Sequence, residues 1–171
     1  MDMKKFVFLD FDGVMDTMRY DNWLIREGFP EADKYGVLFD PQCINNLDLI
    51  ISATGAEIVI TSSWKDWMTY GQLSEMWGER NLPGFLLDVT PTCSHHRGGE
   101  IKKWLELFSE YSKNEYYQYI IIDDLGEMDF NIEQRKHLIQ VDPYFGLDED
   151  ATARAIEILN SGVPANFVVE S

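Results

Sequence analysis

The sequence predicts an α/β fold, with a doubly wound, mainly parallel sheet and helices on both faces. Along the 171 residues, short apolar segments alternate with amphipathic segments, which is the order of strands and crossover helices in such a sheet. The central strand segments are apolar throughout instead of alternating with polar residues, and this pattern is typical of parallel strands covered on both faces. A chain of this length can bury the core of one such domain.

Four segments predict strands, because each is short and rich in β-branched or aromatic residues. They span residues 6–9, 57–60, 119–122 and 137–141. Three of them run directly into a polar residue, namely Asp10, Thr61 and Asp123. Ligands bind beyond the carboxyl ends of the strands in doubly wound sheets, so these three residues mark the candidate site.

Three segments with apolar residues at helical spacing predict helices between the strands. They span residues 41–53, 99–111 and 150–160. Gly162 and then Pro164 follow the last of them and favour a helix end there. The stretch 67–96 predicts one further helix, at 70–77, and a long loop.

Residues 16–40 break the alternation of strands and helices. The stretch is polar and aromatic and contains Gly28, Pro30 and Gly36, so we expect an inserted flap between the first strand and the next helix. At about 25 residues it is too short for a cap domain of its own, because domains rarely fold unaided below about 40 residues. We therefore expect a single domain over residues 1–171, with a short flap instead of a full cap domain.

The chain is strongly acidic, which limits the kinds of partner that it can bind. Fourteen Lys and Arg stand against thirty Asp and Glu, a formal net charge of -16, which repels polyanions such as nucleic acids. No apolar run approaches the roughly 20 residues that span a bilayer, and no apolar signal segment precedes the first strand. Cys43 and Cys93 follow no metal-binding spacing. We expect a cytoplasmic protein with no membrane partner, and the residues indicate no oligomeric state.

The segment "FLDFDGV" places Asp10 and Asp12 directly after the first strand. Such a pair alone is weak evidence in a chain this acidic, and Asp148 with Asp150 forms another. Its context is more informative: an apolar strand leads into it, Gly13 follows, and two further strands end in polar groups suited to phosphate chemistry.

Four segments, in this order, resemble the motifs of the haloacid dehalogenase (HAD) superfamily of phosphohydrolases: "FLDFDGV", "IVITSSW", "RGGEIKKWL" and "YIIIDD". The "TSSW" segment and "VDPYFGLDEDATARAIEIL" near the end of the chain are also similar to the subgroup named for the phosphatase-like domain of Swiss Army Knife RNA repair proteins. The resemblance implies a HAD-like Rossmannoid sheet and a phosphatase that uses Mg²⁺.

By this resemblance, Asp10 is the nucleophile that forms an aspartyl phosphate, and Asp12 protonates the leaving oxygen and later deprotonates water. A covalent intermediate splits one difficult hydrolysis into two easier displacements. The Mg²⁺ ligands would be Asp10, the backbone carbonyl of Asp12, and Asp123 or Asp124, all of which supply the hard oxygens that this ion prefers.

The resemblance also assigns the phosphate contacts. Thr61 would hydrogen-bond the transferring phosphoryl group, with Ser62 as a second donor and Gly13 at the turn beside it. The family places a lysine at the third motif; here Arg97 takes that position, and Lys102, one turn later, is the alternative substrate-binding cation. Arginine can contact phosphate through two N–H groups where lysine offers a compact charge, so an arginine at this position is able to fill the same role.

Four other residues carry open alternatives. Asp129 and Asp16 are candidates to reach the site from neighbouring loops, with exposed surface acids as the alternative. Trp64 and Trp67, just past Thr61, are the only tryptophan pair considered for substrate contact, with core packing as the alternative.

The leading functional hypothesis is a Mg²⁺-dependent phosphatase, a phosphoric monoester hydrolase, acting on a nucleotide or a small phosphorylated metabolite. The second is a nucleic-acid end phosphatase in RNA or DNA repair, which a site without a full cap would admit but which the net charge disfavours. The third is a non-catalytic phosphate-binding protein or phosphoreceiver-like switch. Phosphoreceivers carry their acceptor aspartate on a strand from the middle of the chain, whereas here the candidate acceptor follows the first strand along the chain.

Overall fold

The computed structural model describes residues 3–167 and contains a five-stranded parallel sheet with the order β5-β4-β1-β6-β7. The strands are β1 (Lys4–Leu9), β4 (Glu57–Ile60), β5 (Leu86–Val89), β6 (Tyr117–Asp123) and β7 (Leu138–Gln140). After β1 the chain adds β4 and β5 on one side and then returns to add β6 and β7 on the other. The predicted doubly wound sheet is confirmed, and its order reverses between β1 and β6.

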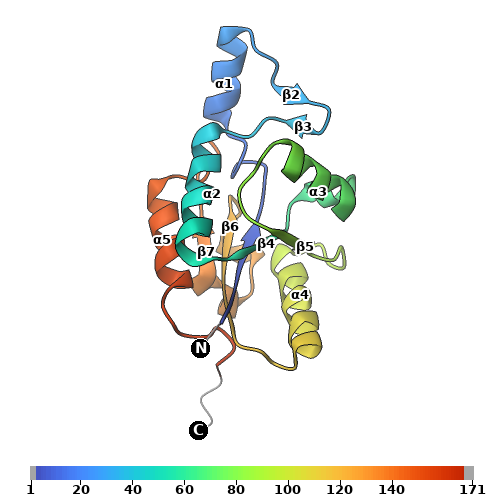
Figure 1. Ribbon diagram of the computed structural model, residues 1–171, viewed down its shortest axis with the longest axis vertical. Helices are drawn as coiled ribbons and strands as arrows, with labels where there is room; N and C mark the ends of the chain where they lie inside the picture. The colour runs from blue at the N-terminus through green and yellow to red at the C-terminus, as the bar shows by residue number, and fades with distance from the viewer. Residues whose placement is uncertain (1–2, 168–171) are drawn as a thin grey trace.

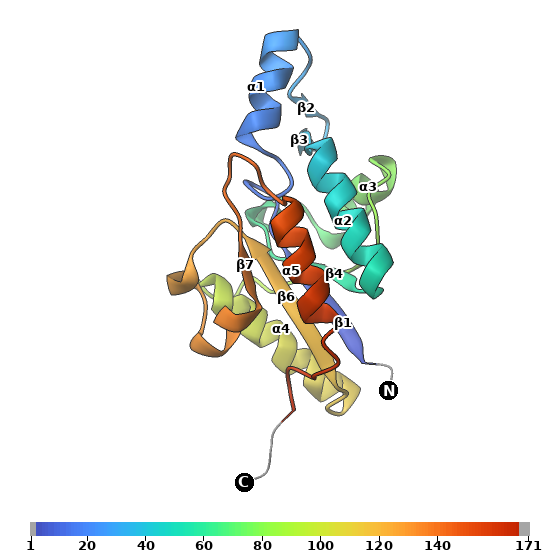
Figure 2. The ribbon, with the colours of Figure 1, turned by 90° about the vertical axis from the view of Figure 1, so that its left-hand side faces the viewer.

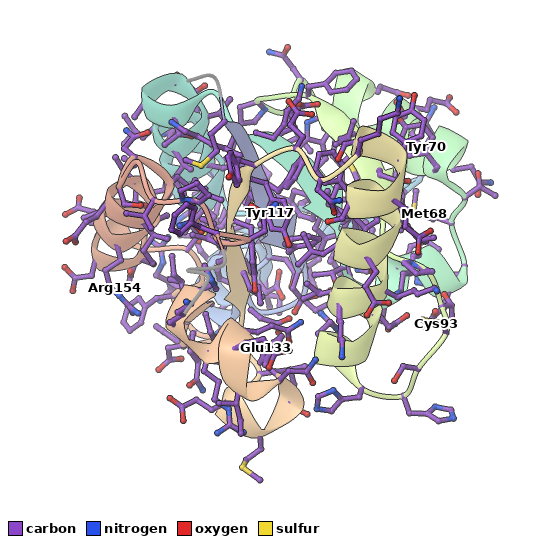
Figure 3. The ribbon with its side chains drawn as sticks, turned by 90° about the horizontal axis from the view of Figure 1, so that it is seen from below. Met68, Tyr70, Cys93, Tyr117, Glu133 and Arg154 are labelled. Carbon is purple, nitrogen blue, oxygen red and sulfur yellow. The ribbon has the colours of Figure 1, made fainter. Side chains whose placement is uncertain are left out.

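Helices cover both faces of this sheet, namely α2 (Pro41–Thr54), α3 (Tyr70–Glu79), α4 (Arg97–Ser112) and α5 (Glu149–Leu159). A further helix, α1 (Met18–Glu27), lies in the insertion that follows β1. Figure 2 shows α2 and α5 in front of the strands, and Figure 3 shows α4 on the opposite side. Successive side chains of β1 point to the two faces: Val7 and Leu9 join the core under α2 and α5, whereas Phe6 and Phe8 pack with Trp104 of α4.

One strand lies where the sequence predicts a loop. β5 has the sequence LLDV and pairs in parallel with β4. Asp88 interrupts its apolar pattern, which hides the strand from sequence reasoning. In the structure the Asp88 carboxylate accepts a hydrogen bond from Trp104 Nε1, at 2.8 Å.

The insertion between β1 and α2 folds as α1 followed by a two-stranded hairpin of β2 (Ala32–Asp33) and β3 (Gly36–Val37). It lies beyond the carboxyl ends of the strands (Figure 1). Thr17, the N-cap of α1, donates a hydrogen bond of 2.7 Å to Asp40, the N-cap of α2. The two ends of the insertion are therefore tied together, and α1 within it is a helix that the sequence did not predict.

None of the helices in residues 3–167 is long and apolar enough to span a membrane.

Candidate active site

The strand register aligns four polar residues along the carboxyl edge of the sheet. Leu9 of β1 pairs with Ile60 of β4 and with Ile122 of β6, and Ile60 pairs with Val89 of β5. The residues one position further along are, from β5 to β6, Thr90, Thr61, Asp10 and Asp123. The sheet thus brings Asp10, Thr61 and Asp123 side by side, at the place where the strand order reverses.

Asp10 and Asp123 share one cation, Arg97, the first residue of α4. Arg97 Nη1 lies 2.8 Å from Asp123 Oδ2 and 3.5 Å from Asp10 Oδ1. Burial, and then the charge of Asp123, raises the pKa of Asp10 to about 9, although Arg97 opposes this shift. Burial also raises the pKa of Asp123, again against Arg97. One guanidinium therefore leaves these buried carboxyl groups short of positive charge.

A third carboxylate, Asp124, completes a cluster that fits a metal ion. Asp10, Asp123 and Asp124 each offer an oxygen, and these oxygens lie within 4.8 Å of one another. Gly13 packs against this cluster with φ of 79°, and a Cβ atom there would lie 2.5 Å from Asp124 Oδ2. The oxygens are ligands that Mg²⁺ prefers, and a divalent cation would supply the charge that Arg97 alone does not.

Asp12 is exposed, and its carboxylate is held by a tryptophan. Trp64 Nε1 donates a hydrogen bond to Asp12 Oδ1 at 3.0 Å. Trp64 is only 3% exposed, so its ring belongs to the core, whereas the ring of Trp67 beside it is 58% exposed. Of the two alternatives for Trp64, the structure supports core packing, with an added polar contact to a candidate catalytic residue.

Asp16 is a buried neighbour of Asp12, and their backbones form an isolated bridge. Burial, and then a hydrogen bond with Asp12, raises the pKa of Asp16 to about 8. As an acceptor, Asp16 Oδ2 has no hydrogen-bond partner among residues 3–167.

Thr61 is fully buried and is oriented by a chain of donors. Lys65 Nζ donates to Thr90 Oγ1 at 3.1 Å, and Thr90 Oγ1 donates to Thr61 Oγ1 at 3.3 Å. Lys65 also pairs with Glu100 at 2.6 Å, with both side chains buried. Thr90 Oγ1 also lies 3.4 Å from the Ile60 carbonyl, so these contacts hold the Thr61 hydroxyl at the carboxyl edge of the sheet.

The structure separates the remaining candidates. Ser62 is fully buried, and its hydroxyl accepts a hydrogen bond from the N–H of Trp64, which caps the 3₁₀ turn Ser63–Asp66. Lys102 is exposed on α4 and lines a surface depression with His96 and Glu133. Arg97, and not Lys102, is the cation that contacts the carboxylate cluster in the described part of the chain.

Thr90 is the residue of this row that sequence reasoning missed. It follows β5, and without that strand nothing in the sequence assigns Thr90 to the edge of the sheet. The contact of Trp64 with Asp12 was also missed, because it joins residues that are 52 positions apart.

Comparison with known proteins agrees with this geometry. Residues 6–152 match the model of a family described as the HAD domain in Swiss Army Knife RNA repair proteins. The matched range includes every candidate site residue from Asp10 to Asp124, and membership of this superfamily supports a hydrolase. Neither the curated proteins nor the solved structures gave a significant match. The chain belongs to the family of HAD domains found in Swiss Army Knife RNA repair proteins, which confirms both the superfamily that the four motifs predict and the subgroup that the "TSSW" segment and residues 141–159 predict.

Proposed function

We propose that the protein is a Mg²⁺-dependent phosphatase that hydrolyses a phosphomonoester through an aspartyl phosphate on Asp10. The observation that carries this proposal is the cluster of Asp10, Asp123 and Asp124, with Arg97 2.8 Å from Asp123. A carboxylate beside a cation and a second group that can transfer protons is suited to nucleophilic attack on phosphorus. The family membership supports the same class of reaction.

In the first step, a carboxylate oxygen of Asp10 attacks phosphorus and the bond to the leaving oxygen breaks. Asp12 gives its proton to that oxygen, so the products are an alcohol and an aspartyl phosphate. Arg97 offsets the negative charge that develops on the phosphoryl oxygens, and the hydroxyl of Thr61 donates a hydrogen bond to one of them.

In the second step, Asp12 is a carboxylate and takes a proton from water. The water oxygen attacks phosphorus, the bond to Asp10 breaks, and inorganic phosphate leaves. Both aspartates then return to their starting states, so the cycle balances without any other reactant.

Asp10, Asp123, Asp124 and the backbone carbonyl of Asp12 are the groups that would hold Mg²⁺. When bound, the ion polarises the phosphoryl group and neutralises carboxylate charge.

We further propose a nucleotide or a small phosphorylated metabolite as the substrate. A small substrate needs only a local pocket, whereas a nucleic-acid strand needs a basic track, and the net charge is -16. A nucleic-acid end phosphatase is the second candidate, and the observation that favours it is the RNA repair association in the name of the matched family.

Turnover of 4-nitrophenyl phosphate tests the reaction. We expect turnover with Mg²⁺, its loss with EDTA, and a fall of about 10³-fold or more in Asp10→Asn, because the nucleophile is removed. The matched control is Asp148→Asn, which lies in the chain's other Asp-x-Asp pair and caps α5; asparagine caps equally well. A stable phosphoaspartate without turnover would indicate a switch, and no reaction of either kind would contradict the proposal.

A substrate screen tests the substrate class. It compares nucleotides, sugar phosphates, and oligonucleotides phosphorylated at either end, with Asp12→Ala beside the wild type. Preference for the oligonucleotides would favour end repair. Equal rates in the wild type and Asp12→Ala would show that the acid and base role of Asp12 is wrong.

A further inference from the structure

Trp64 reaches from the core to the exposed carboxylate of Asp12. Its Nε1 lies 3.0 Å from Asp12 Oδ1, and its ring is 3% exposed. An exposed side chain usually samples several rotamers, so a donor fixed in the core restricts how Asp12 is oriented.

The indole of Trp64 is itself held from several sides. Phe11, the residue between the two motif aspartates, meets it edge to face with ring centroids 5.1 Å apart. The rings of Phe39 and Trp67 lie 5.6 Å and 5.2 Å away. The N–H of Trp64 donates to Ser62 Oγ at 3.2 Å, which fixes the backbone turn. The ring therefore has little freedom to leave Asp12.

The hairpin of the insertion closes the remaining side of this ring. A Cβ atom on Gly36, in β3, would lie 3.2 Å from Trp64 Cη2, so the backbone of β3 runs directly over the indole. Arg80 fastens the hairpin in place: it binds Asp33 through two hydrogen bonds of 2.9 Å and 2.7 Å, and the carbonyl of Gly36 at 3.0 Å. Its guanidinium also lies over the rings of Phe39 and Trp64.

We propose that Trp64 is a positioning residue for Asp12, and that the β2–β3 hairpin, fastened by Arg80, holds its indole in place. The inference rests on the proposed function, because it assigns a role in the proton transfer by Asp12. A donor at Oδ1 leaves Oδ2 of Asp12 as the oxygen that carries the transferred proton. The insertion then acts on the chemistry through Trp64, in addition to covering the carboxyl end of the sheet.

The effect of losing the Trp64 indole N–H on the reaction rate depends on the leaving group of the substrate. Proton donation matters little when the leaving oxygen is already stable as an anion and matters most when it is basic. Loss of the indole N–H should therefore slow the reaction most for substrates with poor leaving groups, whereas a general loss of structure would slow the reaction of all substrates equally.

The test is Trp64→Phe, which keeps an aromatic ring but removes the N–H, assayed on aryl phosphates from 4-nitrophenyl to phenyl. We expect kcat/KM, which reports formation of the aspartyl phosphate, to fall about 10- to 100-fold with phenyl phosphate and less than about threefold with 4-nitrophenyl phosphate. The matched control is Trp77→Phe: Trp77 is also buried in the same core cluster, and its Nε1 donates to the Pro83 carbonyl at 3.1 Å. Trp77→Phe should lower kcat/KM by the same factor for every aryl phosphate in the series.

A double variant separates positioning from packing. If Trp64 acts through Asp12, adding Trp64→Phe to Asp12→Asn should lower the rate no further than Asp12→Asn alone, because the effects of interacting residues are not additive. Additive losses, or an unchanged leaving-group dependence in Trp64→Phe while the wild type turns over, would overturn the inference and leave the proposed function standing.

A signal from the indole itself gives a readout that is independent of turnover. In ¹⁵N-labelled protein, the Nε1–H resonance of Trp64 should shift in Asp12→Asn, while that of Trp77 should not. A Trp64 resonance that does not respond would overturn the inference even with an active enzyme. A wild type without turnover on any phosphomonoester would overturn the proposed function and the positioning role with it, whatever the resonance shows.

Discussion

At the scale of single residues, the candidate site places several carboxyl groups in buried positions, where water cannot solvate their charge. Asp10 and Asp123 are both buried, and their raised pKa values follow first from that burial. Such an arrangement destabilises a protein unless a partner compensates for it. The carboxylate cluster is therefore better explained by ligand binding than by stability.

Gly13 is the residue on which close packing of this cluster depends most directly. In Gly13→Ala, the added Cβ would meet Asp124 Oδ2 at 2.5 Å, and φ of 79° is strained for alanine. We expect a loss of about 1–3 kcal/mol in the free energy of unfolding and a higher Mg²⁺ concentration for half-maximal activity. Urea unfolding and Mg²⁺ titration of turnover measure the two effects.

The control for Gly13 is Gly55→Ala. Gly55 also has a positive φ, 69°, but its Cβ would meet no atom within 4 Å. It should share the cost of backbone strain and leave the Mg²⁺ dependence unchanged. Equal Mg²⁺ dependence in the two variants would contradict the proposal that the carboxylate cluster beside Gly13 binds Mg²⁺.

His137 makes stability depend on pH away from the site. It is buried, stacks on Tyr119 and donates from Nδ1 to the Tyr119 carbonyl at 2.9 Å. Burial lowers the pKa of His137 from 6.5 to about 4. Because the unfolded chain binds a proton that the folded chain excludes, stability from this residue is present above about pH 6.5 and is lost as the pH falls toward 4, by about 3 kcal/mol at most.

Urea unfolding between pH 4 and pH 7 measures this effect, with His137→Gln as the comparison. We expect the difference in unfolding free energy between wild type and variant to shrink as the pH falls. A difference that stays constant over this range would show that protonation of His137 is not coupled to folding.

At the scale of secondary structure elements, the insertion is fastened at its base and at its tip. Thr17 bonds Asp40 at the base, and Arg80 of the α3 C-cap bonds Asp33 of the hairpin at the tip. Tyr35 and Lys34 add contacts to Glu79. The hairpin is too short to be stable alone, so its geometry is set by these contacts with the body of the domain.

Arg80→Ala should release the hairpin from Trp64. We expect a destabilisation of about 1–3 kcal/mol and a fall in kcat/KM that is larger for phenyl than for 4-nitrophenyl phosphate, measured by thermal unfolding and steady-state kinetics. The control is Lys34→Ala, because Lys34 is exposed and pairs with Glu79 on the surface, where ion pairs contribute little. Equal behaviour of the two variants would contradict the role assigned to the Arg80 anchor.

At the scale of the whole molecule, the net charge of -16 repels nucleic-acid strands, and the proposed preference for small substrates rests on this repulsion. At low salt, we expect a lower kcat/KM for an oligonucleotide with a terminal phosphate than for a nucleoside monophosphate. Added salt should raise the relative rate on the oligonucleotide, because it screens repulsion between the two polyanions.

Initial rates on both substrates from 20 to 300 mM KCl, on the order of a tenfold range in ionic strength, measure this effect. A nucleoside monophosphate serves as the internal control because it carries little charge. Oligonucleotide turnover that falls with salt would instead indicate a basic track on the surface and would favour nucleic-acid end repair.

The sequence by itself determined the fold class and the place of the candidate site. The strand segments 6–9, 57–60 and 119–122 lie within β1, β4 and β6, because a strand covered on both faces must be apolar along its whole length, and this is visible locally. Parallel order then places the residues that follow these strands at one edge, which is why Asp10, Thr61 and Asp123 were predicted to meet.

Only the tertiary structure decided which groups touch there. β5 carries an acid in its middle and is stabilised by pairing with β4 and by Trp104, so its own sequence does not reveal it. The choice of Arg97 over Lys102 depends on which side of α4 faces the carboxylates. The bond from Trp64 to Asp12 depends on core packing between distant segments. Local periodicity encodes strands and helices, whereas these contacts arise only when the packed elements set side chains at fixed distances.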